Sequence, residues 1–196
     1  LNPDGSVPND NPLGPGNPTF ALGIRNSFGL CFDPATGQLW ETENGPTEDD
    51  EINLIEPGGN YGWPERLGPG GEPAFVDPVL NFPETIVPTG CAVSDGTLLF
   101  GEGYDGNLHV MPLPGPTEGI VARFDGGITD IAPAPDGSIW VVTPSALYRR
   151  IAPIDALSPM PGNGEPPSGL VSGAGLVIAA LLIGGLLLMR TRLLRR

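Results

Sequence analysis

Three segments of the chain repeat one pattern of apolar and polar positions. Each begins with an apolar stretch, continues through a turn that contains Pro or Asp and ends in glycine, and closes with a short apolar run. Apolar runs bounded by such turns are typical of β-strands, and glycine tolerates the positive φ that a tight hairpin needs, so each segment predicts a β-hairpin. The segments are residues 30–42, 91–102 and 131–143, with turn glycines Gly37, Gly96 and Gly137.

The spacing of these hairpins predicts an all-β architecture. They recur at intervals of roughly 40–60 residues with no amphipathic helical pattern between them, which is typical of the blades of a β-propeller. A β-sandwich would give similar strands, usually with turn signals at closer spacing. About three blades cannot close a ring. Because the sequence also begins at Leu1 without an initiator Met, we expect an N-terminal part to be missing and one flank of the domain to be open.

The C-terminal part predicts a membrane anchor. Residues 170–189 are uncharged and mostly apolar, long enough as one transmembrane helix to cross about 30 Å of hydrocarbon. Arginines follow in a basic tail, residues 190–196, which the positive-inside rule places in the cytoplasm. The Pro/Gly-rich residues 153–169 predict a stalk that holds the domain, residues 1–152, outside the cell membrane. A buried core helix is one alternative, and a sorting tail that is cut after export has a similar pattern.

Charge and composition exclude some partners. The 196 residues include 23 acids against nine Lys and Arg, with a formal net charge of −14, and no lysine occurs. Such an acidic surface repels phosphates, which argues against a protein that binds nucleic acid or anionic lipid and favours divalent cations as partners. The 30 Gly and 25 Pro alternate with apolar runs, which favours short strands and tight turns over low complexity.

Cys31 and Cys91 are the two cysteines of the sequence. Neither belongs to a CxxC motif or lies next to a histidine, so a metal site or a redox motif is not indicated. Two isolated buried thiols and one disulfide formed outside the cytoplasm both remain open at this point.

Residues 43–64, ENGPTEDDEINLIEPGGNYGWP, combine dense negative charge with bulky residues that are typical of a core. Pro46 biases Gly45 toward an extended backbone whose carbonyl can turn outward. Carbonyl oxygens beside carboxylates are hard ligands, which select Ca²⁺ over softer metals. The spacing of the acids is not that of an EF-hand. The alternative is an acidic loop that is simply solvated.

The block from Gly23 to Pro64 resembles the soluble quinoprotein glucose dehydrogenase and aldose sugar dehydrogenase family, also called the glucose/sorbosone dehydrogenase domain. The shared elements, in order, are an Arg-Asn pair, the strand GLCFDPATGQLW, the loop ENGPTEDDEIN and NYGWP. Residues 1–12 and, more loosely, 79–150 are also similar to this family. The resemblance implies that residues 1–150 are about three later blades of a six-bladed propeller.

The resemblance also implies a chemistry. Such an enzyme oxidises the C1 hydroxyl of an aldose sugar by passing a hydride to pyrroloquinoline quinone (PQQ), held over the propeller axis. Arg25 and Asn26 stand where the family contacts the quinone. A calcium ion beside the quinone would polarise its carbonyl groups toward hydride acceptance, and a guanidinium can pair with its carboxylates.

Two calcium sites follow from the same resemblance. Gly45 and Pro46 match the pair whose backbone carbonyls hold the calcium that also grips PQQ. Glu51, by its carboxylate, and Tyr61, by its carbonyl, match ligands of a second calcium that stiffens the structure. Tyr61 and Trp63 are expected to pack beneath the loop, and Glu48, Asp49 and Asp50 to be solvated or to lie behind the metal ligands.

The sequence departs from the family at two places. The family's catalytic base is a histidine in an earlier blade; the one histidine here, His109, does not match it and is expected to be a structural or surface residue. Gly127 and Thr129 stand where the family places two arginines that grip PQQ, and the family's late lysine is missing too. Weaker binding, altered placement or loss of PQQ are therefore all open.

Two functions fit these observations. The first is a membrane-anchored, extracytoplasmic PQQ-dependent aldose dehydrogenase, of which this chain is an N-terminally truncated fragment without the catalytic base. The second is a non-enzymatic, calcium-stabilised propeller that binds a protein or a glycan. Acyl transfer and nucleotide chemistry are not indicated, because the chain has no GxSxG, Walker lysine or GxGxxG motif.

Overall fold

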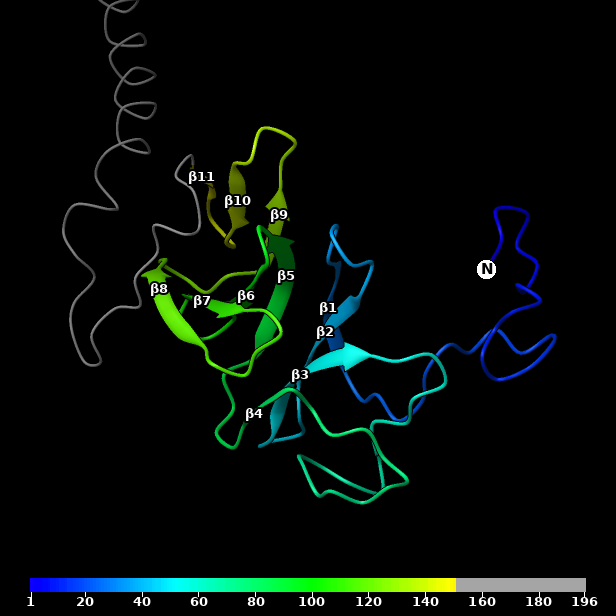
Figure 1. Cartoon of the computed structure of the whole chain (residues 1–196). Coiled ribbons are helices and arrows are strands. Elements are labelled where there is room, and N and C mark those ends of the chain that lie inside the picture. The colour runs from blue at the N-terminus through cyan, green and yellow to red at the C-terminus, as the bar shows by residue number, and fades with distance from the viewer. Residues whose placement is uncertain (151–196) are drawn as a thin grey trace, which may run out of the picture. The chain divides into compact units, whose positions relative to one another are not determined.

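The computed structural model describes residues 1–150, which form eleven strands in three antiparallel sheets and contain no helix in this range (Figure 1). The first sheet consists of β1 (Ser27–Phe32), β2 (Leu39–Glu43), β3 (Asp50–Ile55) and β4 (Leu80–Phe82). The second consists of β5 (Pro88–Ser94), β6 (Thr97–Glu102), β7 (Asn107–Pro112) and β8 (Gly119–Arg123). The third consists of β9 (Asp130–Pro133), β10 (Ile139–Val142) and β11 (Leu147–Arg150).

The three predicted hairpins are confirmed as the first two strands of each sheet. Gly37, Gly96 and Gly137 have φ values of 75°, 70° and 78°, in the left-handed region that favours glycine. Each sheet then continues by pairing with the next strand along the chain, so all neighbours within a sheet are sequential. This up-and-down order within successive sheets is that of propeller blades.

The first strands of the three sheets are neighbours in space. Strand β5 packs against β1 on one side and against β9 on the other (Figure 1). Cys31 of β1 and Cys91 of β5 form a disulfide, so the alternative of two isolated thiols is wrong. The bond joins two neighbouring sheets at their first strands.

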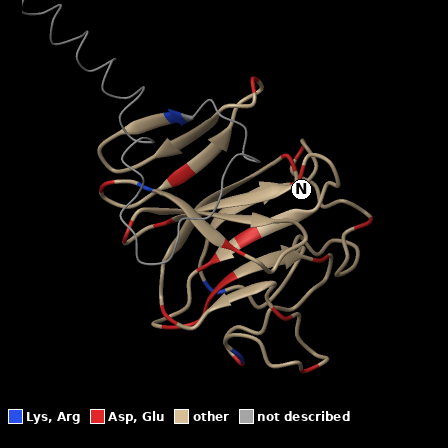
Figure 2. Ribbon diagram, turned by 60° about the vertical axis from the view of Figure 1, so that its left-hand side comes forward, with Lys and Arg blue, Asp and Glu red and all other residues tan. Residues whose placement is uncertain are grey.

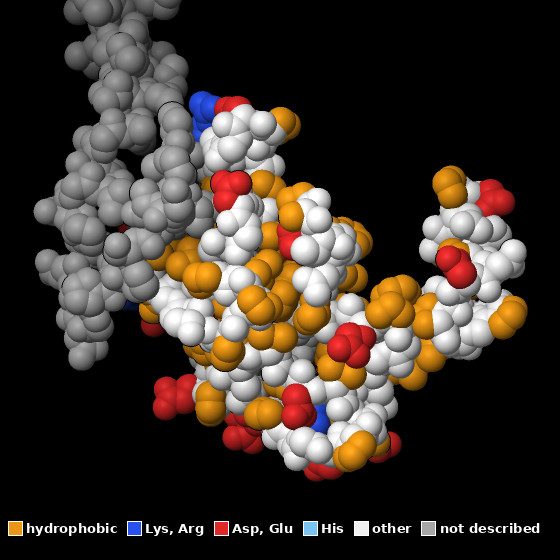
Figure 3. All heavy atoms as spheres, in the orientation of Figure 1, with side chains coloured by type: hydrophobic (Ala, Val, Ile, Leu, Met, Phe, Trp, Pro, Cys, Tyr) orange, Lys and Arg blue, Asp and Glu red, His pale blue; other side chains and the backbone are white. Residues whose placement is uncertain are grey.

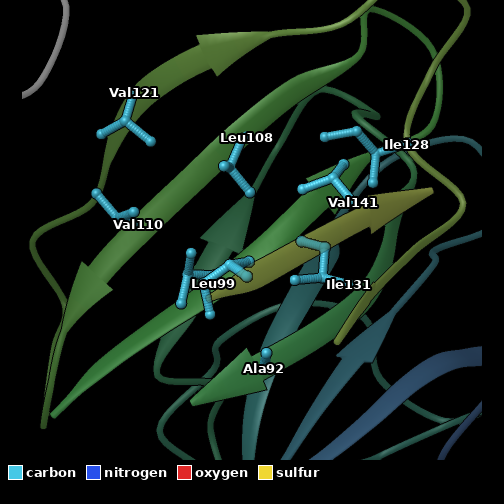
Figure 4. Close-up of a cluster of buried hydrophobic side chains, with 9 residues drawn as sticks. Ala92, Leu99, Leu108, Val110, Val121, Ile128, Ile131 and Val141 are labelled. Carbon is cyan, nitrogen blue, oxygen red and sulfur yellow. The ribbon is translucent and has the colours of Figure 1, made fainter. Parts of the chain in front are cut away.

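The second sheet is buried on both faces. In β6, Leu98 and Phe100 face the first sheet, whereas Leu99 faces the third, and all three side chains are fully buried. Figure 4 shows the cluster between the second and third sheets, to which β5–β10 and the segment before β9 contribute. Its buried members are Ala92, Leu99, Leu108, Val110, Val121, Ile128, Ile131, Ile139 and Val141.

The first sheet is covered on only part of its other face. Phe28, Leu30 and Phe32 of β1 are 57%, 64% and 66% exposed, while the alternate Gly29 and Cys31 are buried toward the second sheet. Within residues 1–150 the row of apolar side chains therefore has no packing partner, which agrees with the open flank expected from the sequence. Figure 3 shows hydrophobic side chains gathered over the sheets on the face in view.

The predicted stalk (153–169), membrane helix (170–189) and basic tail (190–196) lie outside the described residues. Within the described part of the chain, no helix is long and apolar enough to span a bilayer.

Candidate metal and cofactor site

The loop between β2 and β3 is fixed at several points. The amide of Asn44 donates to the carbonyl of Asn26 (3.0 Å), and its side chain Nδ2 donates to the carbonyl of Pro88 in the second sheet (2.8 Å). The turn is tight, because a Cβ on Gly45 would lie 1.8 Å from the carbonyl oxygen of Glu48. Position 45 therefore accepts only glycine.

Arg25 lies against this loop. Its Nη1 donates to the carbonyl oxygens of Asn44 (2.8 Å) and Gly45 (3.1 Å), and its guanidinium carbon lies 5.3 Å from the centre of the Trp63 ring. The backbone amide of Arg25 donates to Oε1 of Glu43 (2.7 Å). The structure thus brings the predicted quinone ligand and the predicted metal loop together. The carbonyl of Gly45 is directed at a positive group.

The other predicted residues of this site are more open. Asn26 and Pro46 are exposed, and Asn26 is tied to the loop through its carbonyl. Trp63 is 37% exposed and its ring lies against the guanidinium of Arg25. Glu48 is exposed as expected. Asp50 is fully buried, which rules out the solvated alternative for this residue and leaves the position behind the predicted metal ligands.

Glu51 and Tyr61, predicted to hold a second calcium, are both buried but bond to separate partners. Glu51 accepts from the amide of Gly68 (3.0 Å) and from Nδ2 of Asn53 (3.2 Å). The hydroxyl of Tyr61 donates to the carbonyl of Leu54 (2.6 Å). No group of three or more Asp, Glu, His or Cys side chains among residues 1–150 is arranged to hold a metal. A metal here would need backbone oxygens as further ligands.

Sequence reasoning missed that Glu41, Glu43 and Asn53 are buried beside Glu51. We call these three glutamates and the asparagine the first-sheet acidic cluster. Register pairs Glu41 with Asn53 and Glu43 with Glu51, which places all four on one face of the β2–β3 hairpin. Figure 2 shows acidic residues within the strands as well as in the loops. The available signal was the period-two spacing of positions 41 and 43 and of 51 and 53.

Oxygen atoms of this cluster lack partners. Within the described residues, Oε1 of Glu41, Oε2 of Glu43 and Oδ1 of Asn53 are buried without a hydrogen-bond donor. Burial, with the nearby charge of Glu43, raises the pKa of Glu41 to about 8. Burial raises the pKa of Glu43 to about 7 and also raises the pKa of Glu51. Buried unpaired acceptors of this kind are unusual and favour a proton or a cation.

His109 is buried in the second sheet and is part of a structural network, as predicted. Its Nδ1 lies 2.8 Å from Oε1 of Glu118, its Nε2 lies 3.2 Å from Oε2 of Glu102, and its ring stacks on Phe100 at 4.7 Å. Burial alone would lower the pKa of His109, but hydrogen bonds and the charges of both carboxylates outweigh it, so the pKa is raised. We call His109, Glu102 and Glu118 the His109 cluster.

Gly127 and Thr129, which the resemblance aligned with two arginines, differ in how much room surrounds them. Gly127 has φ of 78°, and a Cβ there would lie 2.1 Å from the carbonyl oxygen of Gly103. Thr129 is exposed, and its hydroxyl donates to the carbonyl of Val142 (3.1 Å). The close approach of two backbone segments therefore excludes an arginine at position 127.

Comparison with known proteins places this site in context. Residues 1–149 match the family described as Glucose / Sorbosone dehydrogenase. The chain is 41% identical to aldose sugar dehydrogenase YliI of Escherichia coli K12, over 73% of this chain and 46% of that protein. It is 54% identical to quinoprotein glucose dehydrogenase B of Acinetobacter calcoaceticus over 70 residues, 35% of this chain and 14% of that protein.

A solved structure gives the same result. The PQQ-bound aldose sugar dehydrogenase of Streptomyces coelicolor matches with a TM-score of 0.67 and 35% identity, over 73% of this chain and 44% of that one. The chain thus spans less than half the length of these relatives. On the family match and the shared fold, the chain belongs to the glucose/sorbosone dehydrogenase family.

Proposed function

We propose that this chain supplies the later blades of a PQQ-dependent aldose sugar dehydrogenase. The observation that carries the proposal is the contact of the Arg25 guanidinium with the Gly45 carbonyl in a loop that is also bonded to the start of β5. Family membership and relatives described as sugar dehydrogenases support the reaction class. The substrate in this proposal is an aldose, oxidised at its C1 hydroxyl.

The donor chemistry of the loop fits a calcium ion. The Gly45 carbonyl already accepts from the Arg25 guanidinium, and the Pro46 carbonyl accepts no hydrogen bond within the described residues, so it is free to bind a hard cation. Oε2 of Glu43, buried without a donor in the described structure, adds negative charge two residues away. We assign Gly45 and Pro46 to this calcium, and Glu51 with the Tyr61 carbonyl to the second calcium.

The residues next to the first sheet fit PQQ, whereas the segment before the third sheet offers it no arginine at position 127. Arg25 and Asn26 would hold it, with Arg25 pairing with a carboxylate while Trp63 fixes the guanidinium plane. When bound, PQQ supplies the hydride acceptor. Position 127 cannot carry an arginine. His109 is enclosed between two glutamates, so in this proposal the proton of the sugar hydroxyl passes to a base outside these three sheets.

The proposed enzyme acts outside the cytoplasm at the cell membrane. Residues 170–189 provide the apolar segment for anchoring, and the disulfide between Cys31 and Cys91 supports an oxidising compartment. Fractionation of cells that express the intact protein tests this location. Recovery in the soluble cytoplasmic fraction would contradict it.

A second candidate function is a non-enzymatic propeller that keeps calcium and binds a protein or a glycan. The specific observation in its favour is Gly127, whose backbone approach to Gly103 removes a cation that the family uses to grip PQQ. Sugar binding without quinone binding would support this candidate.

The test is reconstitution of the intact protein with Ca²⁺ and PQQ, followed by dye reduction with a panel of aldoses. Turnover that is lost in Arg25→Gln and kept in Arg149→Gln supports the dehydrogenase, because Arg149 pairs only with groups of its own sheet in the described structure. Absence of both bound quinone and turnover would overturn it. A calcium-dependent rise in melting temperature without quinone binding supports the second candidate.

A further inference from the structure

The carboxylate of Asp50, at the start of β3, accepts hydrogen bonds from backbone amides that belong to two different sheets and their loops. Its Oδ1 accepts from the amide of Gly45 (2.8 Å), and its Oδ2 accepts from the amides of Ile86 and Val87 (2.8 Å each). Gly45 belongs to the loop of the first sheet, whereas Ile86 and Val87 lead into β5 of the second. Asp50 is fully buried, so all three donors are held away from water.

The segment before β5 is strained where it reaches Asp50. Val87 has φ of 57°, a conformation that is a genuine outlier for a β-branched residue. Such strain persists only where surrounding contacts fix the backbone, and it gathers at functional sites. Here the amide of Val87 is held by Asp50, and its carbonyl accepts from the amide of Gly103 (2.8 Å).

One peptide group links Asp50 to Arg25 by two hydrogen bonds. The amide that donates to Asp50 belongs to the peptide between Asn44 and Gly45, and the carbonyl of that same peptide accepts from Nη1 of Arg25 (2.8 Å). A carboxylate on the N–H side polarises a peptide and strengthens the bond that its carbonyl accepts. Asp50 therefore sets both the plane of this peptide and the strength of its hold on Arg25.

We propose that Asp50 is a positioning residue of the metal and cofactor site. It turns the backbone of residues 44–46 so that the carbonyl oxygens face Arg25 and a bound cation, and it keeps this loop in register with the start of β5. This inference rests on the proposed function for the identity of the cation. Of the two alternatives expected from the sequence for Asp50, it develops the position behind the metal ligands and discards the solvated carboxylate.

The test compares Asp50→Asn with Asp49→Asn in the intact protein. Asp49 is the adjacent acid, half-buried, and accepts only from Nδ2 of Asn81 in the described structure. Binding of Ca²⁺ is measured by calorimetry, and amide exchange is followed at Gly45, Ile86 and Val87. We expect at least tenfold weaker Ca²⁺ binding and faster exchange at all three amides in Asp50→Asn, and a change under twofold in Asp49→Asn.

The outcomes separate this inference from the proposed function. Equal Ca²⁺ affinity in wild type and Asp50→Asn, including no binding by either, overturns the positioning role, even where the melting temperature falls. Partial recovery of affinity in Asp50→Glu supports it, because a carboxylate is restored at a displaced position. Absence of sugar oxidation by wild-type protein that still binds Ca²⁺ overturns the dehydrogenase while leaving the role of Asp50 in place.

Discussion

Two buried acidic clusters in neighbouring sheets are built on opposite principles. In the His109 cluster, the imidazole lies between Glu102 and Glu118, and Asn107 donates to Glu102 at 2.6 Å. In the first-sheet acidic cluster, three glutamates and Asn53 converge without a cationic side chain bonded to any carboxylate within residues 1–150, and three oxygen atoms have no donor. One cluster carries its own counter-charge and the other does not.

The pKa values of the carboxyl groups show which cluster has its negative charge balanced by side chains of the described residues. Burial would raise the pKa of Glu102, but hydrogen bonds from His109 and Asn107 outweigh it and the pKa is lowered. The pKa values of Glu41, Glu43 and Glu51 are raised instead, because burial outweighs their hydrogen bonds. A buried carboxylate that lacks a partner is costly, so the first-sheet cluster is stabilised by protons or by a cation. The His109 cluster serves structure.

Removal of the internal counter-charge is expected to have the largest effect. In His109→Gln, Glu102 and Glu118 lose their cation, and breaking a buried pair in this way costs about 3 kcal/mol of unfolding free energy. Denaturant unfolding at pH 6 measures the change, with Glu118→Gln as the milder control because Glu118 is partly exposed. A loss below about 1 kcal/mol, the value of an exposed pair, would show that the network is not structural.

Addition of Ca²⁺, as a counter-charge for the first-sheet acidic cluster, is expected to have the next largest effect on stability. Calcium at 100 times its dissociation constant would stabilise the folded protein by about 2.7 kcal/mol. Melting temperatures are compared with Ca²⁺ and with chelator, for wild type and for Glu51→Gln. The gain should fall in Glu51→Gln and persist in His109→Gln. Equal melting temperatures of the wild type under both conditions would contradict the assignment of calcium to this sheet.

The pH dependence of Glu41 gives a smaller effect. Its folded pKa of about 8 lies above the ordinary 4.5, so its favourable contribution is present at low pH and is lost as the pH rises toward 8. Glu41→Gln does not lose this stability and should gain about 2 kcal/mol of unfolding free energy relative to wild type between pH 5 and pH 6.5. Unfolding in chelator at both pH values measures it. Parallel profiles would show that Glu41 does not hold a proton.

The pH dependence of the His109 cluster should be the smallest effect and of mixed sign. The raised pKa of His109 contributes stability below pH 6.5 that is lost as the pH rises through the folded value. The lowered pKa of Glu102 contributes stability above pH 4.5 that is lost as the pH falls through its folded value. The difference in unfolding free energy between wild type and His109→Gln should be largest between the folded pKa values of Glu102 and His109 and should shrink as the pH rises to 8. A flat difference would contradict the pairing.

The sequence predicted local features well. The hairpins at Gly37, Gly96 and Gly137 follow from turn chemistry, which depends on a few adjacent residues. Arg25 and Gly45 were matched to a site by resemblance, and the structure brings them into contact. Their contact depends on the tight loop between β2 and β3. This loop requires glycine at position 45 because of the nearby carbonyl of Glu48, which is also a local feature of the sequence.

The rest depends on contacts between distant parts of the chain. In the sequence Asp50 resembles the other loop acids, but in the fold the segment before β5 brings two amides to it from 36 and 37 residues away. In the sequence, Glu41 and Glu43 look like the polar, solvent-facing side of a strand. Their burial depends on the register of β2 with β3 and on residues outside this hairpin that pack over it. Tyr61 was predicted for its carbonyl, whereas its fixed hydrogen bond to Leu54 uses the hydroxyl, which the motif does not reveal.

The disulfide between Cys31 and Cys91 spans 60 residues and encloses the β2–β3 hairpin, the exposed segment around Glu65 and the loop that leads to β5. A protease that nicks the backbone anywhere inside this covalent loop leaves the two pieces attached to each other. Such a nicked chain runs as a single band on a gel until a reducing agent is added, so digestion patterns with and without reductant map this part of the molecule directly.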